Sequence, residues 1–242
     1  MLQPPAARQR DIDPMLAEPT IAEDLLLLLF QPDVGVRPGR GAIAGEGTLY
    51  AVLAGAVLAE LALGEHVRAT RSGSGVEVVD DRPPTDALLR AAWNYVGQRP
   101  RAVQTALAAI GPTLRAPVLA RVVDRGDIVA TQHRYLGLFE STVLEGADSD
   151  RRARLMTAAR AVLVDGAAPS PRTAALVALL WASGTLPQFD PDIPWSSAVI
   201  ARARELEQGD WGAGAAGEAV QRTVLAIFSA TVASALSAPS QP

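Results

Sequence analysis

Few side chains in this sequence belong to the types that carry out acid-base or nucleophilic catalysis. The chain has no cysteine and only two histidines, His66 and His133. Thiolate nucleophiles and thiolate metal ligands are therefore excluded, and two histidines do not supply the roughly three protein ligands of a zinc site. Both fall in segments that favour short hairpins, so we interpret them as exposed strand or turn residues. No catalytic residue, metal ligand or cofactor is predicted.

Two further features have residue types that could take part in chemistry, namely a glycine-rich segment and a carboxylate in an apolar helix. Gly39, Gly41, Gly45 and Gly47 are spaced as closely as the glycines of a phosphate-binding loop, but no strand precedes them and no Lys-Ser/Thr pair follows. The sequence therefore does not predict a nucleotide-binding loop here.

Glu60 interrupts an apolar helical run, where burial of even a neutral polar group without a partner costs about 2–7 kcal/mol. We expect an arginine or a backbone group to pair with it. A structural ion pair is favoured over a functional acid, because nothing nearby completes a site.

Arg115 has the clearest binding chemistry in the sequence. It stands two residues before Pro117, a residue that is tolerated in the first turn of a helix. A guanidinium at the start of a helix adds its donors to the free backbone N–H groups there, which together suit a phosphate. The alternative is an exposed loop arginine, since the chain holds 22 basic residues, all of them arginine.

The elements that would position these residues are mostly helices. Thr20 and Glu23 have the spacing of a capping box before the run 25–30, which ends at a Gln-Pro pair. Residues 33–47 are rich in Gly, Pro and Arg and predict a loop. The stretch 49–63 is apolar on every side, which predicts the central core helix.

The rest of the chain alternates helices with two hairpin signals. Residues 65–70 and 76–80 flank a Ser-Gly-Ser-Gly turn, and residues 127–130 and 135–139 flank the polar segment 131–134, which we predict to be a turn. Capping and periodicity predict further helices starting near Thr85 or Asp86, at Arg101, near Pro117, and over 149–165, 171–183, 196–208 and 215–236.

These elements predict a mainly α fold, with a helical core ringed by amphipathic helices and one or two short β-hairpins. We expect a flexible segment at 1–17, a single domain at 18–236 and a frayed tail at 237–242.

The net charge of −4 argues against broad nucleic-acid binding. The N-terminus lacks the apolar core of a signal peptide, and the most apolar run is shorter than the ~20 residues of a membrane span. A cytoplasmic location is expected.

Four ordered motifs carry a family resemblance. They are Thr20-Ile21-Ala22-Glu23-Asp24 with its leucine run, Leu58-Ala59-Glu60-Leu61-Ala62-Leu63, Pro84-Thr85-Asp86 before a helix, and Val123-Asp124-Arg125-Gly126 before a hairpin. Together with the helices at 172–183 and 218–229, they resemble the Golgi phosphoprotein 3 family over residues 18–236. The alanine-rich, lysine-free composition suggests a bacterial member.

The resemblance implies a non-enzymatic peripheral membrane protein. Eukaryotic members bind phosphatidylinositol 4-phosphate and contact the cytoplasmic tails of membrane glycosyltransferases, so an anionic lipid head group and such tails are the expected partners, with the inner face of the membrane as the location. Arg115 falls on one arginine of the family's head-group pocket. Pro112 and Ala54 stand where two others would be, and Gly45 lies near the place of the pocket tryptophan. The arginines that could substitute are Arg37, Arg40 and Arg68.

Family members also self-associate through a protruding hairpin. The resemblance assigns that role here to residues 127–139, with contacts from Asp127, Ile128, Val129, Tyr135, Leu136, Leu138 and Phe139. Loss of two cationic donors from the pocket removes charge-assisted hydrogen bonds worth about 1.5–3 kcal/mol each. An alternative therefore stays open: a soluble interaction scaffold that forms homo-oligomers through this hairpin without lipid specificity.

Overall fold

The fold was obtained as a computed structural model of the whole chain, and it describes most of the domain. The described residues are 18–32, 41–79, 82–135, 139–147, 149–209 and 217–237. The predicted flexible segment at 1–17 and all but the first residue of the predicted tail lie outside them.

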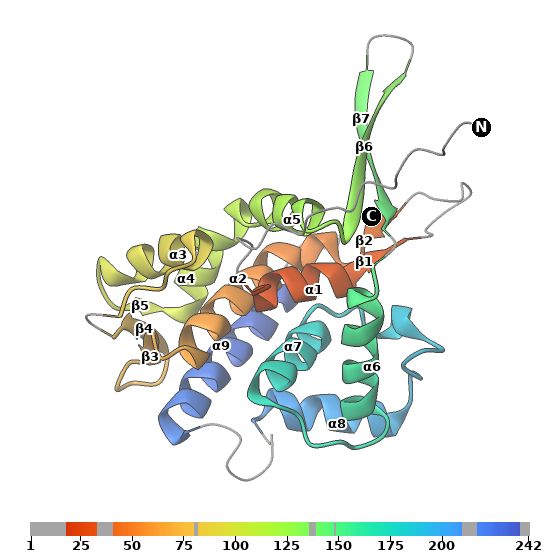
Figure 1. Ribbon diagram of the computed structural model, residues 1–242. Coiled ribbons are helices and arrows are strands. Elements are labelled where there is room, and N and C mark those ends of the chain that lie inside the picture. Colours follow the sequence, from red (N-terminus) through yellow and green to blue (C-terminus); the bar gives the residue numbers. More distant parts are fainter. Residues whose placement is uncertain are drawn as a thin grey trace, which may run out of the picture.

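Helices dominate the described part of the chain (Figure 1). The α-helices are α1 (Ile21–Leu29), α2 (Glu46–Leu63), α3 (Ala87–Gly97), α4 (Val103–Ile110), α5 (Arg115–Asp124), α6 (Arg151–Leu163), α7 (Pro171–Ala182), α8 (Ser197–Glu207) and α9 (Glu218–Leu236). Two 3₁₀ helices, η1 (Gly111–Thr113) and η2 (Leu186–Phe189), join neighbouring elements. The strands are β1 (Phe30–Gln31), β2 (Ala42–Ile43), β3 (Val67–Ala69), β4 (Gly75–Val78), β5 (Arg101–Ala102), β6 (Ile128–Tyr135) and β7 (Phe139–Gly146). The predicted mainly α class with short hairpins is confirmed.

The central helix is α2, as its uniform apolarity predicted. It begins three residues earlier than expected and contacts α1, α3, α4, α5, α7 and α9. A single cluster of buried side chains draws on every helix of the described part. The ring of helices around α2 is visible in Figure 1, where α9 passes behind it and α7 lies below it.

Two helices of the described part are long and apolar enough to cross a membrane by length and composition, namely α2 and α9. The pair formed by Val103–Thr113 and α5 would make a third if its 56° bend were counted within one span. In this fold 67% of the apolar window of α2 is buried, against 33% of that of α9. Most apolar residues of α9 that are not fully buried are half-buried against the core, and Leu236 at its end is exposed.

Helix ends follow the local signals of the sequence. The Thr20 side chain accepts from the Glu23 N–H, and the Glu23 carboxylate accepts from the Thr20 N–H, so the predicted capping box is present. The Ser170 side chain caps α7 with Pro171 in the first turn, and Gly184 after that helix has φ 72°. Because these signals act within four residues, the sequence predicted most helix ends to within three positions.

The first predicted hairpin is confirmed and has an additional strand. Strands β3 and β4 pair antiparallel around the Ser-Gly turn, with Val67 opposite Val78. Strand β5 adds to β4 from a segment that we had predicted as the start of a helix, and α4 begins at Val103 instead. The region 33–47, predicted as a loop, likewise contains β2, which pairs with β1.

The second hairpin differs from the prediction in its turn and its length. Residues 131–134 lie inside β6 instead of forming the turn, and β6 pairs with β7 from Ile128 opposite Gly146 to Tyr135 opposite Phe139. The physical reason is that 131–134 contains no Gly, Pro, Asn or Asp to support a turn, whereas residues 139–146 are rich in strand-forming types. The hairpin projects away from the helical body (Figure 1).

Candidate functional site

Arg115 is the first residue of α5, as its predicted position required. Its guanidinium lies against Glu46 at the start of α2: Nε donates to Oε2 over 3.0 Å and Nη2 donates to Oε1 over 2.7 Å. Hydrogen bonding to this carboxylate raises the pKa of Arg115 above its ordinary value, although partial burial acts in the opposite direction. The side chains of Arg115 and Glu46 are 48% and 47% exposed, so solvent and solutes reach this ion pair.

A cleft of about 410 Å³ opens beside this pair. Its walls come from β2, the first turn of α2, the start of α5 and strand β7. The Gly41 N–H, just before β2, donates to the Leu144 carbonyl of β7 over 2.6 Å. This hydrogen bond joins the base of the hairpin to β2. The lining residues are Gly41, Ala42, Ile43, Glu46, Arg115, Thr142, Val143 and Leu144.

The first turn of α2 faces this region without a side-chain cap. Gly45 occupies the N-cap position with φ 70° and ψ 33°, and no side chain accepts from the N–H groups that follow. A glycine is required because the backbone is left-handed and an added Cβ would lie 2.7 Å from the Thr185 Cγ2 atom. Gly47 has open space around its Cα. Arg115 and the positive end of a helix dipole therefore lie on one side of the cleft.

The arginines proposed as substitutes are not brought together with Arg115 in the described structure. Arg68 lies on β3, where Nε donates to Glu77 over 2.9 Å. This strand follows the C-terminal end of α2, whereas Arg115 contacts the N-terminal end, and 18 residues of helix span roughly 27 Å. Arg37 and Arg40 belong to residues 33–40, outside the described residues. Of the family pocket positions, Ala54 is fully buried in α2 and Pro112 lies exposed in η1.

The residues assigned to the hairpin divide into a fixed base and an outer part. Asp127 precedes β6, is 8% exposed, and accepts from Arg151 and from the Ser149 hydroxyl, so it anchors the hairpin to α6. Ile128 is buried and Val129 is 44% exposed. Tyr135 and Phe139 form the last strand pair. Leu136 and Leu138 lie outside the described residues.

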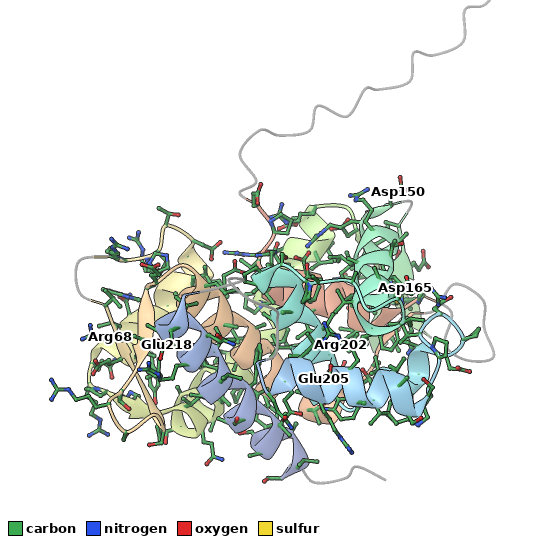
Figure 2. The ribbon with its side chains drawn as sticks, turned by 90° about the horizontal axis from the view of Figure 1, so that it is seen from below. Arg68, Asp150, Asp165, Arg202, Glu205 and Glu218 are labelled. Carbon is green, nitrogen blue, oxygen red and sulfur yellow. The ribbon has the colours of Figure 1, made fainter. Side chains whose placement is uncertain are left out.

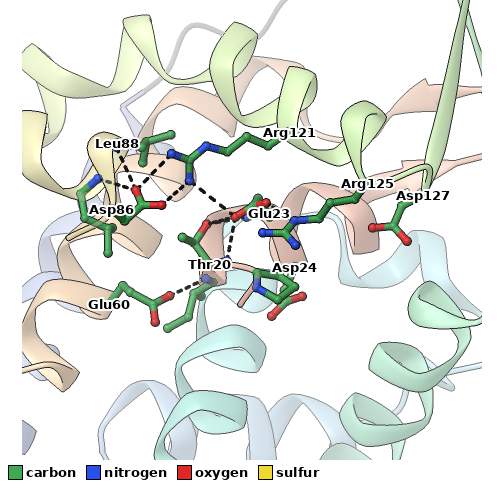
Figure 3. A network of polar contacts seen from close by, with 12 residues as sticks. Thr20, Glu23, Asp24, Glu60, Asp86, Leu88, Arg121, Arg125 and Asp127 are labelled. Atoms are coloured by element: carbon green, nitrogen blue, oxygen red, sulfur yellow. Dashed lines mark hydrogen bonds and ion pairs between the residues drawn. The ribbon is translucent and has the colours of Figure 1, made fainter. Parts of the chain in front are cut away.

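A buried charge network, which the sequence did not predict, surrounds the start of α1 (Figure 3). Glu23 is fully buried and accepts from Arg125 Nε over 2.7 Å as well as from the Thr20 backbone and hydroxyl. Asp24, 6% exposed, accepts from Arg151 and Arg172 at 2.6 and 2.7 Å. The network thus joins α1 to α5, α6 and α7. The sequence predicted only the capping spacing of Glu23 and a partner for Glu60.

Glu60 is the last member of this network, and its expected partners are present. The Ile21 N–H donates to Oε2 over 2.5 Å and Arg172 Nη1 donates to Oε1 over 2.8 Å. Burial raises the pKa of Glu60, and the attraction of Arg172 only partly offsets this. Both carboxylate oxygens are engaged in structural contacts, so the feature that had suggested an acid catalyst is a helix-joining ion pair.

The two histidines lie in different strand regions of the fold. The His66 Nδ1 atom lies 2.6 Å from the Arg82 carbonyl oxygen, and His133 lies in β6 instead of a turn. Within the described residues no three His, Cys, Asp or Glu side chains form a group that could hold a metal ion.

A protein-family model matches most of this chain. The family model for Golgi phosphoprotein 3 (GPP34) covers residues 21–223, which includes the helical core, the Arg115 cleft and the hairpin. No curated protein matches this chain. Because the match spans most of the chain and the fold agrees with the expected helical core and protruding hairpin, this protein belongs to the Golgi phosphoprotein 3 (GPP34) family.

Proposed function

We propose that this protein is a non-enzymatic peripheral membrane protein that binds the anionic head group of a membrane lipid at the Arg115 cleft. The observation that carries the proposal is the half-exposed, two-point ion pair between Arg115 and Glu46 beside the uncapped start of α2. Family membership supports the same class of function. The expected location is the inner face of the cytoplasmic membrane.

The ion pair supports an exchange in which a phosphate takes the place of Glu46. Arginine presents the same planar fork of donors to a carboxylate and to a phosphate. An exposed ion pair contributes only about 0–1 kcal/mol, so separating Arg115 from Glu46 costs little. A phosphate also gains from the N–H groups at the start of α2, which favour negative charge.

The missing family donors set the expected selectivity. With Ala54 buried and proline at position 112, Arg115 is the one pocket arginine carried over from the family pattern. A single guanidinium recognises a phosphate but makes few contacts with the rest of a head group. We therefore expect binding to anionic lipids as a class, with a modest preference for phosphatidylinositol 4-phosphate.

The test is flotation of the purified protein with liposomes of neutral lipid, of generic anionic lipid, and of phosphatidylinositol 4-phosphate. Arg115→Ala should weaken binding to both anionic liposomes about tenfold or more, the equivalent of one charge-assisted hydrogen bond. Glu46→Gln should strengthen it, because Arg115 loses its competitor. Arg222→Ala is the matched control, since this arginine is 63% exposed and pairs with Glu218 on α9.

Two results would contradict the proposal. One is a wild-type protein that ignores anionic liposomes at low salt, where electrostatic attraction is strongest. The other is binding that Arg115→Ala and Arg222→Ala reduce equally, which would mean that only net charge matters.

The projecting hairpin favours a second candidate, self-association as an interaction scaffold. Eight residue pairs join β6 and β7, and the two strands extend beyond the helical body (Figure 1). Replacing residues 129–145 by a short glycine linker leaves the Asp127 anchor in place. Light scattering should then report a smaller mass than for the wild type if the hairpin joins copies, and an unchanged mass would reject this role.

A further inference from the structure

A few large hydrophobic side chains are exposed at the surface. Among the described residues they are Val129, Trp195 and Leu236, which are 44%, 45% and 82% exposed. Val129 lies at the base of the hairpin, opposite Glu145. The other two line a groove of about 400 Å³.

This groove is built from the end of α7, the η2 turn and the end of α9. Trp181 and Trp195 stack there, with ring centroids 6.3 Å apart and an interplanar angle of 24°. The Trp181 indole N–H donates to Glu207 over 2.8 Å, which holds that ring in place. The Trp195 indole N–H has no hydrogen-bond partner within the described part of the chain. The lining residues are Trp181, Ala182, Gly184, Leu186, Pro187, Trp195, Glu207, Val232 and Leu236.

Direct contacts place the groove beside the Arg115 cleft. The Thr48 hydroxyl, in the first turn of α2, donates to the Ser183 carbonyl at the end of α7 over 2.9 Å. The Tyr50 hydroxyl, one turn from Glu46, donates to the Ser234 carbonyl near the end of α9 over 3.4 Å. The groove and the cleft therefore flank the same end of α2.

The charged residues of α9 are confined to its first turns, away from the groove. Glu218 and Arg222 stand near its start, and no charged residue occurs from Thr223 to Ser237. Its start lies at the opposite end of the molecule, where Glu218 and Arg68 share a pocket wall (Figure 2). Helix α9 thus has a charged start near the C-terminal end of α2 and an apolar end near the N-terminal end of α2.

Within the described part of the chain, no segment fills the groove. The residues after Ser237 are Ala-Pro-Ser-Gln-Pro, which contain no large apolar side chain. Gly209 packs against Leu225, which is 11 residues or roughly 17 Å of helix before Leu236.

We propose that a lipid bilayer surface covers this groove, with Trp195 and Leu236 entering the interfacial layer while Arg115 binds a head group. The inference rests on the proposed function and extends it to a second contact. Tryptophan is enriched at the membrane–water interface, where its ring lies among acyl chains and its N–H faces head groups or water. A stacked, half-exposed tryptophan with a free N–H beside an exposed leucine fits that layer.

The first test uses liposomes whose acyl chains carry bromine, which quenches tryptophan fluorescence on contact. The wild-type full chain should be quenched with a blue-shifted emission, and Trp195→Phe should lose most of both effects while still floating. The second test compares Leu236→Glu with Ala219→Glu. Both positions are exposed on α9 and both changes add one negative charge, so general repulsion from the vesicle is matched. Leu236→Glu should weaken partitioning about tenfold more than the control.

The outcomes separate this inference from the proposed function. If the wild type does not float with any anionic liposome, both fail. If it floats in an Arg115-dependent manner, but bromine leaves Trp195 unquenched and the two glutamate variants behave alike, the groove does not contact lipid and only the inference fails. If Leu236→Glu converts a dimer to a monomer in light scattering without lipid, a second copy covers the groove and the inference is overturned.

Discussion

Replacing Glu23 with glutamine tests the buried charge network most directly. Glu23 is fully buried and accepts from Arg125 at 2.7 Å and from the Thr20 backbone and hydroxyl at 2.8 Å each. Glutamine keeps the shape and one acceptor for the capping box but removes the negative charge. Breaking a buried ion pair by removing one partner costs about 3–5 kcal/mol. We expect a loss of that size in the free energy of unfolding, a large share of the 5–15 kcal/mol typical of a domain.

Urea unfolding followed by circular dichroism measures this loss. Glu218→Gln is the matched control, because Glu218 is 91% exposed, pairs with Arg222 on the same helix, and should cost less than about 1 kcal/mol. In a double-mutant cycle with Arg125→Met, the loss in the double variant should fall well short of the sum of the single losses. A Glu23→Gln variant as stable as Glu218→Gln would refute the view that the network holds α1 in place.

Further predictions concern pH and helix packing. Burial acts to raise the pKa of Asp86, but hydrogen bonds from Arg121 and from two backbone N–H groups at the start of α3 lower it below the ordinary 3.8. A lowered carboxyl pKa adds stability that is present above the unfolded value and is lost as pH falls through the folded value. Asp86→Ala should therefore cost about 2 kcal/mol at neutral pH, and acid titration of urea midpoints should show this difference shrinking below about pH 4. Gly55→Ala should destabilise the fold by about 1–3 kcal/mol in thermal unfolding, because the new Cβ would lie 2.5 Å from the Thr231 hydroxyl where α2 crosses α9. Gly47→Ala, in the same helix with nothing within 4 Å, should instead gain about 0.5–1 kcal/mol.

The sequence predicted what is decided by neighbours along the chain. The Thr20–Glu23 box, the Ser170 cap and the uniformly apolar α2 each depend on residues within a few turns, and all three are present. The charge network depends on partners far apart: Arg172 lies 148 residues from Asp24. With 22 arginines in the chain, residue type alone does not reveal which arginine meets which carboxylate.

The prediction for the second hairpin was wrong about its turn, and for a different reason. We assigned the polar run 131–134 to a turn because its neighbours are apolar, but polarity alone does not bend a backbone. A strand that leaves the helical body has no core to face, so its polar side chains need not alternate with buried ones. The better signal was negative, since none of the usual turn residues occurs between 131 and 134.

The Arg115 cleft depends both on residues that are neighbours along the chain and on residues far apart in it. Its position at a helix start is a local property, and the sequence predicted it. Its state in the fold is set by Glu46, which is 69 residues away and comes from the turn whose backbone N–H groups would help to bind an anion. The same turn therefore supplies both the attraction for a phosphate and the competitor for its guanidinium. Affinity at this cleft should accordingly depend on the charge at position 46 as well as on the arginine itself.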